Sequence, residues 1–216
     1  PISGSMSPAG GIKGYEPPNG LGFDPDAALR ELASAGWRLD DEHNLRSASG
    51  ELFPEIELLY TTSSSRHQRI ATALRGQWEE TLGVNVRLVG KDSKAFSVDL
   101  RQGDFMIARG RWYGDWGDPT TFLNLFRTGN GNNDRGFSDE SIDAALAAAD
   151  VQPDPAARYR SMAAVEKDLF EKHLPLLPIC QIVEIGMYDP QQLSGMTTHP
   201  RLIQYLGDIR FVKETP

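Results

Sequence analysis

Two acidic and three aromatic side chains gather in one short stretch, the part of the sequence best suited to catalysis or binding. Asp115 and Asp118 stand three positions apart, among Trp112, Tyr113 and Trp116. Two carboxylates about 5–9.5 Å apart on either side of a glycosidic bond can hydrolyse that bond. A single carboxylate among aromatic rings can instead hold an ammonium group, because each ring adds about 0.5–2 kcal/mol of cation–π attraction. The residue types therefore allow either a glycosidase or a binding site for a cation.

The two aspartates differ in what their neighbours imply. Pro119 follows Asp118, and an acidic residue before a proline is typical of a helix start. We therefore expect Asp118 to cap a helix over residues 120–126. Asp115 follows Gly114, where it could form a turn with its own backbone or bind a ligand through charge-assisted hydrogen bonds. The residues alone leave both interpretations of Asp115 open.

No other constellation in the sequence points to catalysis or to a bound metal. The histidines have no acidic residue or cysteine at a metal-ligand spacing; they are His43, His67, His173 and His199. The sequence contains neither a glycine-rich phosphate loop nor the nucleophile elbow of serine hydrolases. The single cysteine, Cys180, excludes an internal disulfide, and we expect it to be a small buried apolar residue. We therefore expect no catalytic residue, no cofactor and no metal.

Composition is that of an ordinary globular protein. Of the 216 residues, 39% are hydrophobic and 24% charged, enough for one large domain or two small ones. The net charge of −8, with no basic run, argues against nucleic acid and against an anionic membrane surface as partners. No apolar stretch approaches the roughly 20 residues that span a bilayer.

Helices and strands alternate along the chain, which predicts a mixed β-sheet flanked by helices, in the α+β (mixed α/β) class. Apolar periodicity and capping residues predict helices over residues 25–35, 66–82, 93–101, 120–126, 139–149 and 155–174. Alternating or continuous apolar runs predict strands over residues 56–60, 84–89, 104–112, 176–187, 203–206 and 209–212. Expected caps are Asp24, Ser138 and Asp154 at helix starts and Gly83 at a helix end. His67, near the start of its helix, is expected to be exposed.

Three segments together resemble the bacterial extracellular solute-binding proteins of family 5, the oligopeptide- and dipeptide-binding components of ABC importers. They are Phe23-Asp-Pro-Asp-Ala-Ala-Leu-Arg-Glu-Leu-Ala-Ser-Ala-Gly-Trp37, Trp78-Glu-Glu-Thr-Leu-Gly-Val-Asn-Val86 and Trp112-Tyr-Gly-Asp-Trp-Gly-Asp-Pro-Thr-Thr-Phe-Leu123. The last is similar to the family's Trp-x-x-Asp-Tyr-x-Asp-Pro-x-x-Phe-Leu motif. The resemblance covers nearly the whole chain.

The resemblance implies a particular domain organisation. Family members are usually more than twice this long and fold into two lobes that close over the ligand. By this comparison residues 1–20 are a linker from a missing N-terminal lobe, and residues 21–200 are the C-terminal ligand-binding lobe. Residues 201–216 would then form strands that return toward the missing lobe.

The resemblance also implies a peptide ligand. Asp115 matches the aspartate that holds the α-ammonium of a peptide lying as an extra strand between the lobes. Trp112 matches a pocket-lining tryptophan, and Tyr113 and Trp116 lie beside it in the motif. Arg109 and His67 match positions that meet the peptide's carboxylate end in some oligopeptide binders.

Two positions depart from the family pattern. Ser93 stands where oligopeptide binders often have tryptophan, and Ile182 where an aromatic residue is common. These departures leave the length of the peptide and the preference of its pockets open.

The expected function is therefore capture of short peptides for an ABC importer, without catalysis. The implied partners are a peptide, the N-terminal lobe, and the permease and ATPase subunits, with the binding protein itself a monomer. Its implied location is periplasmic or otherwise extracytoplasmic, with any membrane anchor in a region absent from this sequence. The alternatives are a family-5 binder of a nickel chelate, an oligosaccharide or another small solute, and a glycoside hydrolase that uses Asp115 and Asp118.

Overall fold

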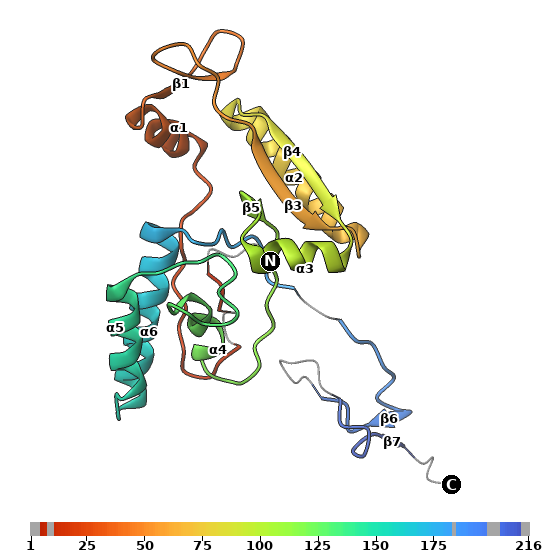
Figure 1. The fold of residues 1–216 in the computed structure, drawn as a ribbon. Helices are drawn as coiled ribbons and strands as arrows, with labels where there is room; N and C mark the ends of the chain where they lie inside the picture. Colours follow the sequence, from red (N-terminus) through yellow and green to blue (C-terminus); the bar gives the residue numbers. More distant parts are fainter. Residues whose placement is uncertain (1–4, 8–10, 183–184, 198–203, 213–216) are drawn as a thin grey trace. The chain divides into compact units, whose positions relative to one another are not determined.

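The chain divides into two compact units, whose elements are labelled in Figure 1. The computed structural model describes residues 5–7, 11–182, 185–197 and 204–212. The sheet unit comprises Gly22–Arg111 and Gly131–Gly136. The helical unit comprises Pro1–Leu21, Trp112–Asn130 and Phe137–Pro216.

A three-stranded parallel sheet is the centre of the sheet unit. Its strands are β3 (Ile56–Thr61), β4 (Val86–Lys91) and β5 (Ile107–Ala108), in the spatial order β4-β3-β5. Helix α2 (Ser65–Leu82) connects β3 to β4, and α3 (Ser93–Gln102) connects β4 to β5. Because parallel neighbours need such crossovers, the carboxyl ends of all three strands meet at one edge of the sheet.

The apolar faces of these elements form the core of the sheet unit. Ile56 of β3 lies opposite Val86 of β4, and Leu58 lies opposite Ile107 of β5. Figure 1 shows α2 running along β3 and β4. The buried residues of this core are Leu45, Leu58, Tyr60, Ala71, Val84 and Val86.

A helix and a short hairpin complete the sheet unit. Helix α1 (Pro25–Ser34) begins as predicted, with the Asp24 carboxylate accepting a hydrogen bond from the Ala27 N–H at 2.9 Å. The antiparallel strands β1 (Trp37–Leu39) and β2 (Leu45–Ser47) form in a stretch where no strand was predicted. The hairpin is stabilised by the Trp37 ring, which packs edge-on against Phe53 with ring centroids 4.9 Å apart.

Gly83 ends α2 in a conformation that no other residue can adopt without strain. Its φ is +64°, and an added Cβ would lie 2.3 Å from the backbone oxygen of His43. That backbone is held close, because the Leu45 N–H donates to the Gly83 oxygen at 2.8 Å. Gly103 ends α3 at a similar φ of +69°, but its Cβ would meet nothing within 4 Å.

We expect Gly83→Ala to destabilise the sheet unit clearly more than Gly103→Ala. Gly103→Ala should lower the free energy of unfolding by about 1–2 kcal/mol, the strain of a left-handed alanine. Gly83→Ala adds the collision with His43 to the same strain. Urea denaturation followed by tryptophan fluorescence measures both losses, and equal losses would contradict the packing described for Gly83.

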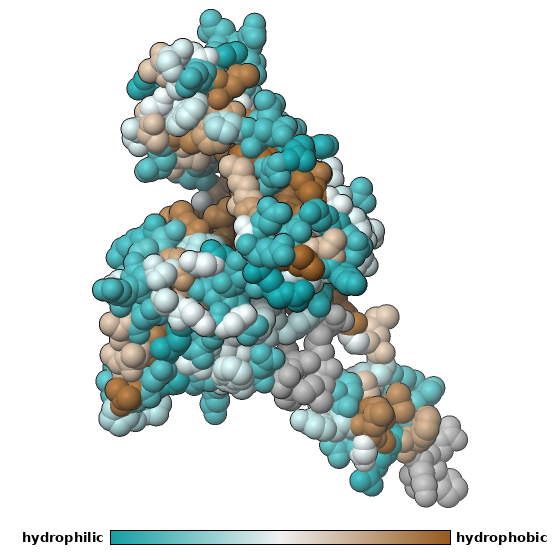
Figure 2. Space-filling model, in the orientation of Figure 1, coloured by the Kyte–Doolittle hydropathy of each residue, from teal (hydrophilic) through white to brown (hydrophobic). Residues whose placement is uncertain are grey.

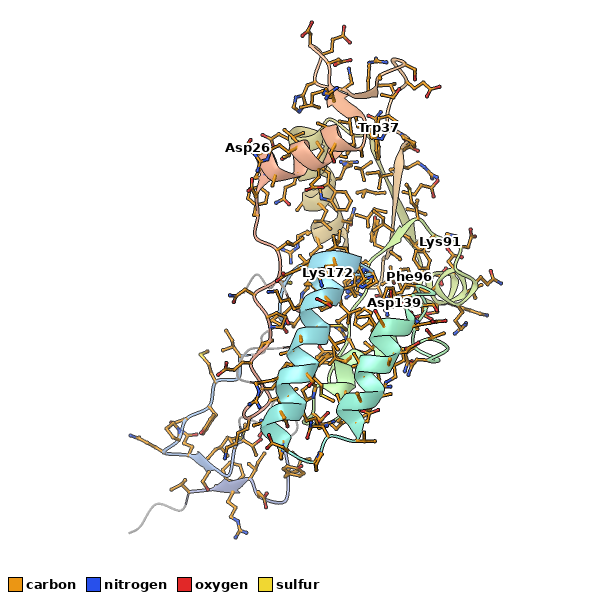
Figure 3. The ribbon with its side chains drawn as sticks, turned by 90° about the vertical axis from the view of Figure 1, so that its left-hand side faces the viewer. Asp26, Trp37, Lys91, Phe96, Asp139 and Lys172 are labelled. Carbon is orange, nitrogen blue, oxygen red and sulfur yellow. The ribbon has the colours of Figure 1, made fainter. Side chains whose placement is uncertain are left out.

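The helical unit is built on two antiparallel helices, α5 (Glu140–Asp150) and α6 (Pro155–Asp168). A π-helical turn, η2 (Leu169–His173), extends α6. Figure 3 shows α5 and α6 side by side, with Asp139 and Lys172 at the same end of the pair. Asp139 caps α5, with its carboxylate accepting from the Ser141 and Ile142 N–H groups at 2.9 and 3.0 Å. The predicted cap, Ser138, is therefore wrong; its hydroxyl pairs with that of Thr128 instead.

A short helix, α4 (Thr120–Leu123), and a 3₁₀ turn, η1 (Asn124–Phe126), pack on this helix pair. The Phe126 ring makes an edge contact with Phe170, with centroids 5.7 Å apart. The buried residues of this core are Ile12, Tyr15, Phe122, Leu123, Leu125, Phe126, Ile142, Leu146, Ala149, Met162, Val165, Leu169 and Phe170.

A buried carboxylate ties the beginning of the chain to α6. Glu166 is 0% exposed and accepts hydrogen bonds from the hydroxyls of Ser5 and Tyr15, both at 2.5 Å. The N–H groups of Met6 and Ser7 donate to it at 3.1 and 2.9 Å. Burial, followed by the charge of Glu166, raises the pKa of Tyr15, so its hydroxyl stays protonated and donates. Within the stretch that we expected to be an extended linker, Ser5, Ser7, Ile12 and Tyr15 are thus buried in the helical unit.

We expect Glu166→Leu to lower the free energy of unfolding by at least about 3 kcal/mol, because each buried donor left without an acceptor costs about 1–3 kcal/mol. Tyr15→Phe, which removes one of the four donors, should have a smaller effect. Lys167→Leu changes an exposed neighbour on α6 and should have little effect. Denaturant titration compares the three variants, and a neutral Glu166→Leu would contradict a structural role for this network.

Several predicted strands differ from the structure. The strand expected over residues 104–112 is limited to β5, whose pairing ends where the Arg109 N–H donates to the Leu59 oxygen. Residues 176–182 and 185–187 contain no strand apart from a single bridge at Cys180. Pro178 explains this, because it lacks a backbone donor and interrupts a ladder. Cys180 itself is exposed, not buried as expected.

The terminal strands are also rearranged. β7 (Arg210–Phe211) lies within the strand expected over residues 209–212, but it pairs antiparallel with β6 (Leu193–Ser194), which was not predicted. The expected strand at 203–206 is absent from residues 204–206, and residue 203 lies outside the described ranges. Figure 2 shows hydrophobic surface gathered over this hairpin, where Leu206 and Phe211 are 81% and 84% exposed. None of the helices in the described ranges is long and apolar enough to cross a membrane.

Candidate ligand-binding site

The loop that precedes α4 carries a carboxylate without a partner. The Asp115 side chain is exposed, and among the described residues nothing forms a hydrogen bond or ion pair with its oxygens. Its backbone is fixed, because its N–H donates to the Thr121 hydroxyl at 2.7 Å. Asp115 therefore presents a free negative charge on an anchored backbone, and it does not form the turn with its own backbone that we considered.

The aromatic residues of this loop offer apolar surface of different kinds. Trp112 is partly buried against the core of the helical unit, and its Nε1 is buried with no hydrogen-bond partner in the described part of the chain. Tyr113 and Trp116 are 42% and 50% exposed. Trp116 is held by a hydrogen bond from its Nε1 to the Thr120 hydroxyl at 3.0 Å. The helical unit thus carries the predicted carboxylate and all three predicted rings on one loop.

Asp118 is engaged in structural contacts. Its Oδ1 accepts from the N–H and the hydroxyl of Thr120 at 3.0 and 2.7 Å, so its side chain binds the first residue of α4, although the cap position that we expected Asp118 to occupy is taken by Pro119. The Arg158 guanidinium donates to both carboxylate oxygens, at 2.5 and 3.0 Å. Burial alone would raise the pKa of Asp118, but the hydrogen bonds from Arg158 and Thr120 hold it below its ordinary value of 3.8. A glycosidase acid needs a raised pKa, so Asp118 does not suit that role.

Arg109 and His67 belong to the sheet unit and lie at the carboxyl ends of its strands. Arg109 directly follows β5, and its guanidinium has no hydrogen-bond or ion-pair partner among the described residues. His67 lies in the first turn of α2, with its Nδ1 at 3.1 Å from the backbone oxygen of Thr61, the last residue of β3. We expected His67 to be exposed; this was wrong, because the start of α2 folds back over the end of β3 and leaves the ring 8% exposed.

Positive charge dominates the surroundings of these two residues. Burial lowers the pKa of Arg109, and the charges of Arg111 and Arg66 lower it further. Lys91, at the end of β4, is paired with Asp99 of α3 at 2.5 Å, which raises its pKa; Figure 3 labels Lys91 beside α3. Arg109 is therefore a cation available to an anionic group. The carboxyl edge of a parallel sheet, where α2 and α3 also present their N termini, is a common place for such a ligand.

Acidification should destabilise the sheet unit through His67. Burial, followed by the charge of Arg109, lowers the pKa of His67 below its ordinary value of 6.5. The unfolded state then binds more protons, so this contribution to stability is complete above the ordinary pKa and is lost as the pH falls below it. We expect the free energy of unfolding to fall less between about pH 7 and pH 5 in His67→Gln than in wild type.

The control for this experiment is His43→Gln, which changes an exposed histidine of the same unit. Denaturant titrations at several pH values give the slope for each variant. A His67→Gln slope equal to that of wild type would show that His67 is not held neutral by the fold.

The contacts that organise the loop involve residues not singled out from the sequence. Thr120, Thr121 and Arg158 supply them, and Arg158 lies 40 residues from Asp118 along the chain. No local pattern could have paired them, because the contact exists only once α6 packs beside α4. Ser93 and Ile182, the two departures from the family pattern, are exposed at the start of α3 and 36% exposed after Cys180, respectively.

Each unit therefore carries a group suited to a charged solute: an open carboxylate among aromatic rings in the helical unit, and a guanidinium at a sheet edge in the sheet unit. A family model described as bacterial extracellular solute-binding proteins, family 5 middle, matches residues 2–134. The chain belongs to the bacterial extracellular solute-binding proteins of family 5. The resemblance found in the sequence is confirmed.

Known relatives agree with this family. The chain is 30% identical over 202 residues to the periplasmic murein peptide-binding protein MppA of Escherichia coli, a match that covers 92% of this chain and 37% of MppA. It is 34% identical over 189 residues to the oligopeptide-binding protein OppA of Bacillus subtilis, covering 86% of this chain and 33% of OppA. The chain thus spans little more than a third of the length of these relatives.

A solved structure confirms the predicted mixed α/β fold class. The structure of the Escherichia coli murein tripeptide-binding protein MppA superposes with a TM-score of 0.79 and 27% sequence identity. The superposition covers 99% of this chain and 40% of MppA. One detail of the prediction changes: the expected single mixed sheet is replaced in the described residues by a parallel sheet and two antiparallel hairpins.

Proposed function

We propose that this chain is the ligand-binding part of the substrate-binding component of an ABC importer, and that its ligand is a short peptide. The observation that carries the proposal is the Asp115 carboxylate, which is exposed, unpaired and anchored by its backbone beside three aromatic rings. Such a carboxylate suits the α-ammonium of a peptide, since it supplies charge-assisted hydrogen bonds. The printed names of MppA and OppA, both peptide-binding proteins, support the proposal.

The other candidate residues have complementary roles in this proposal. Trp112, with a buried and unpaired Nε1, lines the pocket for a peptide side chain, and the exposed Tyr113 and Trp116 flank the ammonium. In the sheet unit, Arg109 has a guanidinium that suits a carboxylate, the group it is expected to bind from the family resemblance. His67, whose pKa is lowered by burial and by the charge of Arg109, stays neutral and therefore does not add a second positive charge beside Arg109. The protein performs no chemistry on the ligand, in keeping with the low pKa and full pairing of Asp118.

A second lobe completes the protein in this proposal. The chain spans 37% of the length of MppA, and the β6–β7 hairpin exposes apolar side chains of the kind that mark an interface. Residues 1–20 then connect to that lobe, residues 21–200 form the C-terminal lobe, and residues 201–216, in part outside the described ranges, return toward the other lobe. The complete protein is a monomer outside the cytoplasm that delivers its peptide to permease and ATPase subunits.

Calorimetry with matched peptides tests the ammonium site in the full-length protein. We expect Asp115→Asn to weaken binding of a tripeptide with a free amino terminus by several kcal/mol, since a buried ammonium left unpaired costs about 3–5 kcal/mol. The same variant should bind the N-acetylated tripeptide about as weakly as wild type does. Asp41→Asn, which removes another exposed carboxylate, is the control and should bind like wild type.

Two results would contradict the proposal in different ways. Equal wild-type affinity for the free and acetylated peptides would remove the ammonium role of Asp115 but leave peptide binding intact. No binding of any peptide, together with binding of a nickel chelate or an oligosaccharide, would assign the protein to another solute.

A further inference from the structure

The loop of Asp115 is tied to α6 by one ion pair. Arg158 of α6 binds Asp118 through two parallel hydrogen bonds, Nη1 to Oδ2 at 2.5 Å and Nη2 to Oδ1 at 3.0 Å. The two side chains are only 21% and 25% exposed. Such a two-pronged contact fixes direction as well as distance, and partial burial protects it from screening by salt. The loop therefore has a defined orientation relative to α6.

A series of hydrogen bonds connects Asp118 to Asp115, the carboxylate that is proposed to bind the ligand. The Asp118 carboxylate accepts hydrogen bonds from the N–H and the hydroxyl of Thr120. The Asp118 backbone oxygen accepts from the Thr121 N–H at 3.1 Å. The Thr121 hydroxyl then accepts the N–H of Asp115, and the Thr120 hydroxyl accepts the Trp116 Nε1. Both sides of the proposed ammonium site, the carboxylate and a ring, thus depend on the first turn of α4.

That first turn cannot hold its shape unaided. α4 contains only four residues, and an isolated helix of that length is unstable in water because its first turn is costly to form. The loop backbone is also closely packed against it, since a Cβ added at Gly114 would lie 3.2 Å from the Phe122 ring and 3.3 Å from Thr121. A shift of α4 would therefore move Asp115 with it.

Arg158 also removes a competing charge. Asp118 lies three residues from Asp115, and without Arg158 its negative charge would have no cationic partner, because Thr120 supplies only neutral donors to Oδ1. A ligand ammonium would then have two acceptors in different directions. With Arg158 in place, Asp115 is the acceptor left open on the loop.

We propose that Arg158 is a positioning residue of the ligand site, which makes the protein selective for ligands with a free amino terminus by holding Asp118, α4 and, through them, Asp115. This inference rests on the proposed peptide-binding function. Arg158 does not contact Asp115 directly: among the described residues it forms no hydrogen bond or ion pair with residues 112–117.

The test compares the affinity of the full-length protein for a tripeptide with that for its N-acetylated form, in wild type, Arg158→Met and Arg158→Lys. We expect the ratio of the two affinities to fall by about tenfold or more in Arg158→Met, the loss of roughly one charge-assisted hydrogen bond. Arg158→Lys keeps the charge without the fork and should restore part of the ratio. Arg160→Met, an exposed arginine two residues further along α6, should leave it unchanged.

The ratio distinguishes positioning from general stability. A purely structural role would weaken both peptides by the same factor, and that result would overturn the proposal. The double variant provides a second test. In a protein that already carries Asp118→Asn, Arg158→Met should change the ratio of the two affinities little further, because the two residues act as one unit. Independent, additive losses would contradict the relay. A wild-type ratio of one would overturn the ammonium site itself, and so would be distinguishable from a failure of Arg158 alone.

Discussion

The buried face of α6 is the constraint on which the helical unit depends. Glu166 is fully buried, and its carboxylate accepts hydrogen bonds from four donors within residues 5–15. A buried carboxylate without such donors would cost several kcal/mol, so the beginning of the chain cannot leave α6 without exposing or stranding that charge. Two turns earlier, Arg158 of the same helix holds the loop that precedes α4. One helix thus fixes two segments that are far apart in the sequence.

Three carboxylates of the helical unit illustrate how surroundings assign different roles to the same group. Among the described residues, Glu166 accepts hydrogen bonds from two hydroxyls and two backbone N–H groups, and it anchors the backbone of Met6 and Ser7. Asp118 is paired with an arginine and two donors of Thr120, and its pKa is lowered accordingly. Asp115 has an anchored N–H but free oxygens. Of these three carboxylates, Asp115 is the one whose oxygens are left for a ligand, and the proposed function follows from that difference.

The positive groups of the sheet unit likewise differ in whether a protein group compensates their charge. Parallel strands bring Thr61, Lys91 and Arg109 to one edge, together with the N termini of α2 and α3. Lys91 is neutralised by Asp99, and His67 is kept uncharged by burial and by its cationic neighbours. Arg109 is left with its charge uncompensated. Within the sheet unit, Arg109 is therefore the cation at this edge that is available to an anionic group.

The sequence by itself determined the features whose causes lie within a turn or two of the chain. Asp24 and Asp154 cap their helices, Gly83 ends α2, and the crossover helices between β3, β4 and β5 lie where apolar periodicity places them. The family and the exposed Asp115 were also recognisable, because both reside in a contiguous motif. Only the tertiary structure decided the burial of His67, the pairing of Asp118 with Arg158 and the acceptor role of Glu166. The last two depend on contacts across 40 to 161 residues, and no local preference encodes which distant side chain will be near once the helices have packed. His67 contacts Thr61 only six residues away, but its burial requires the start of α2 to pack on the end of β3.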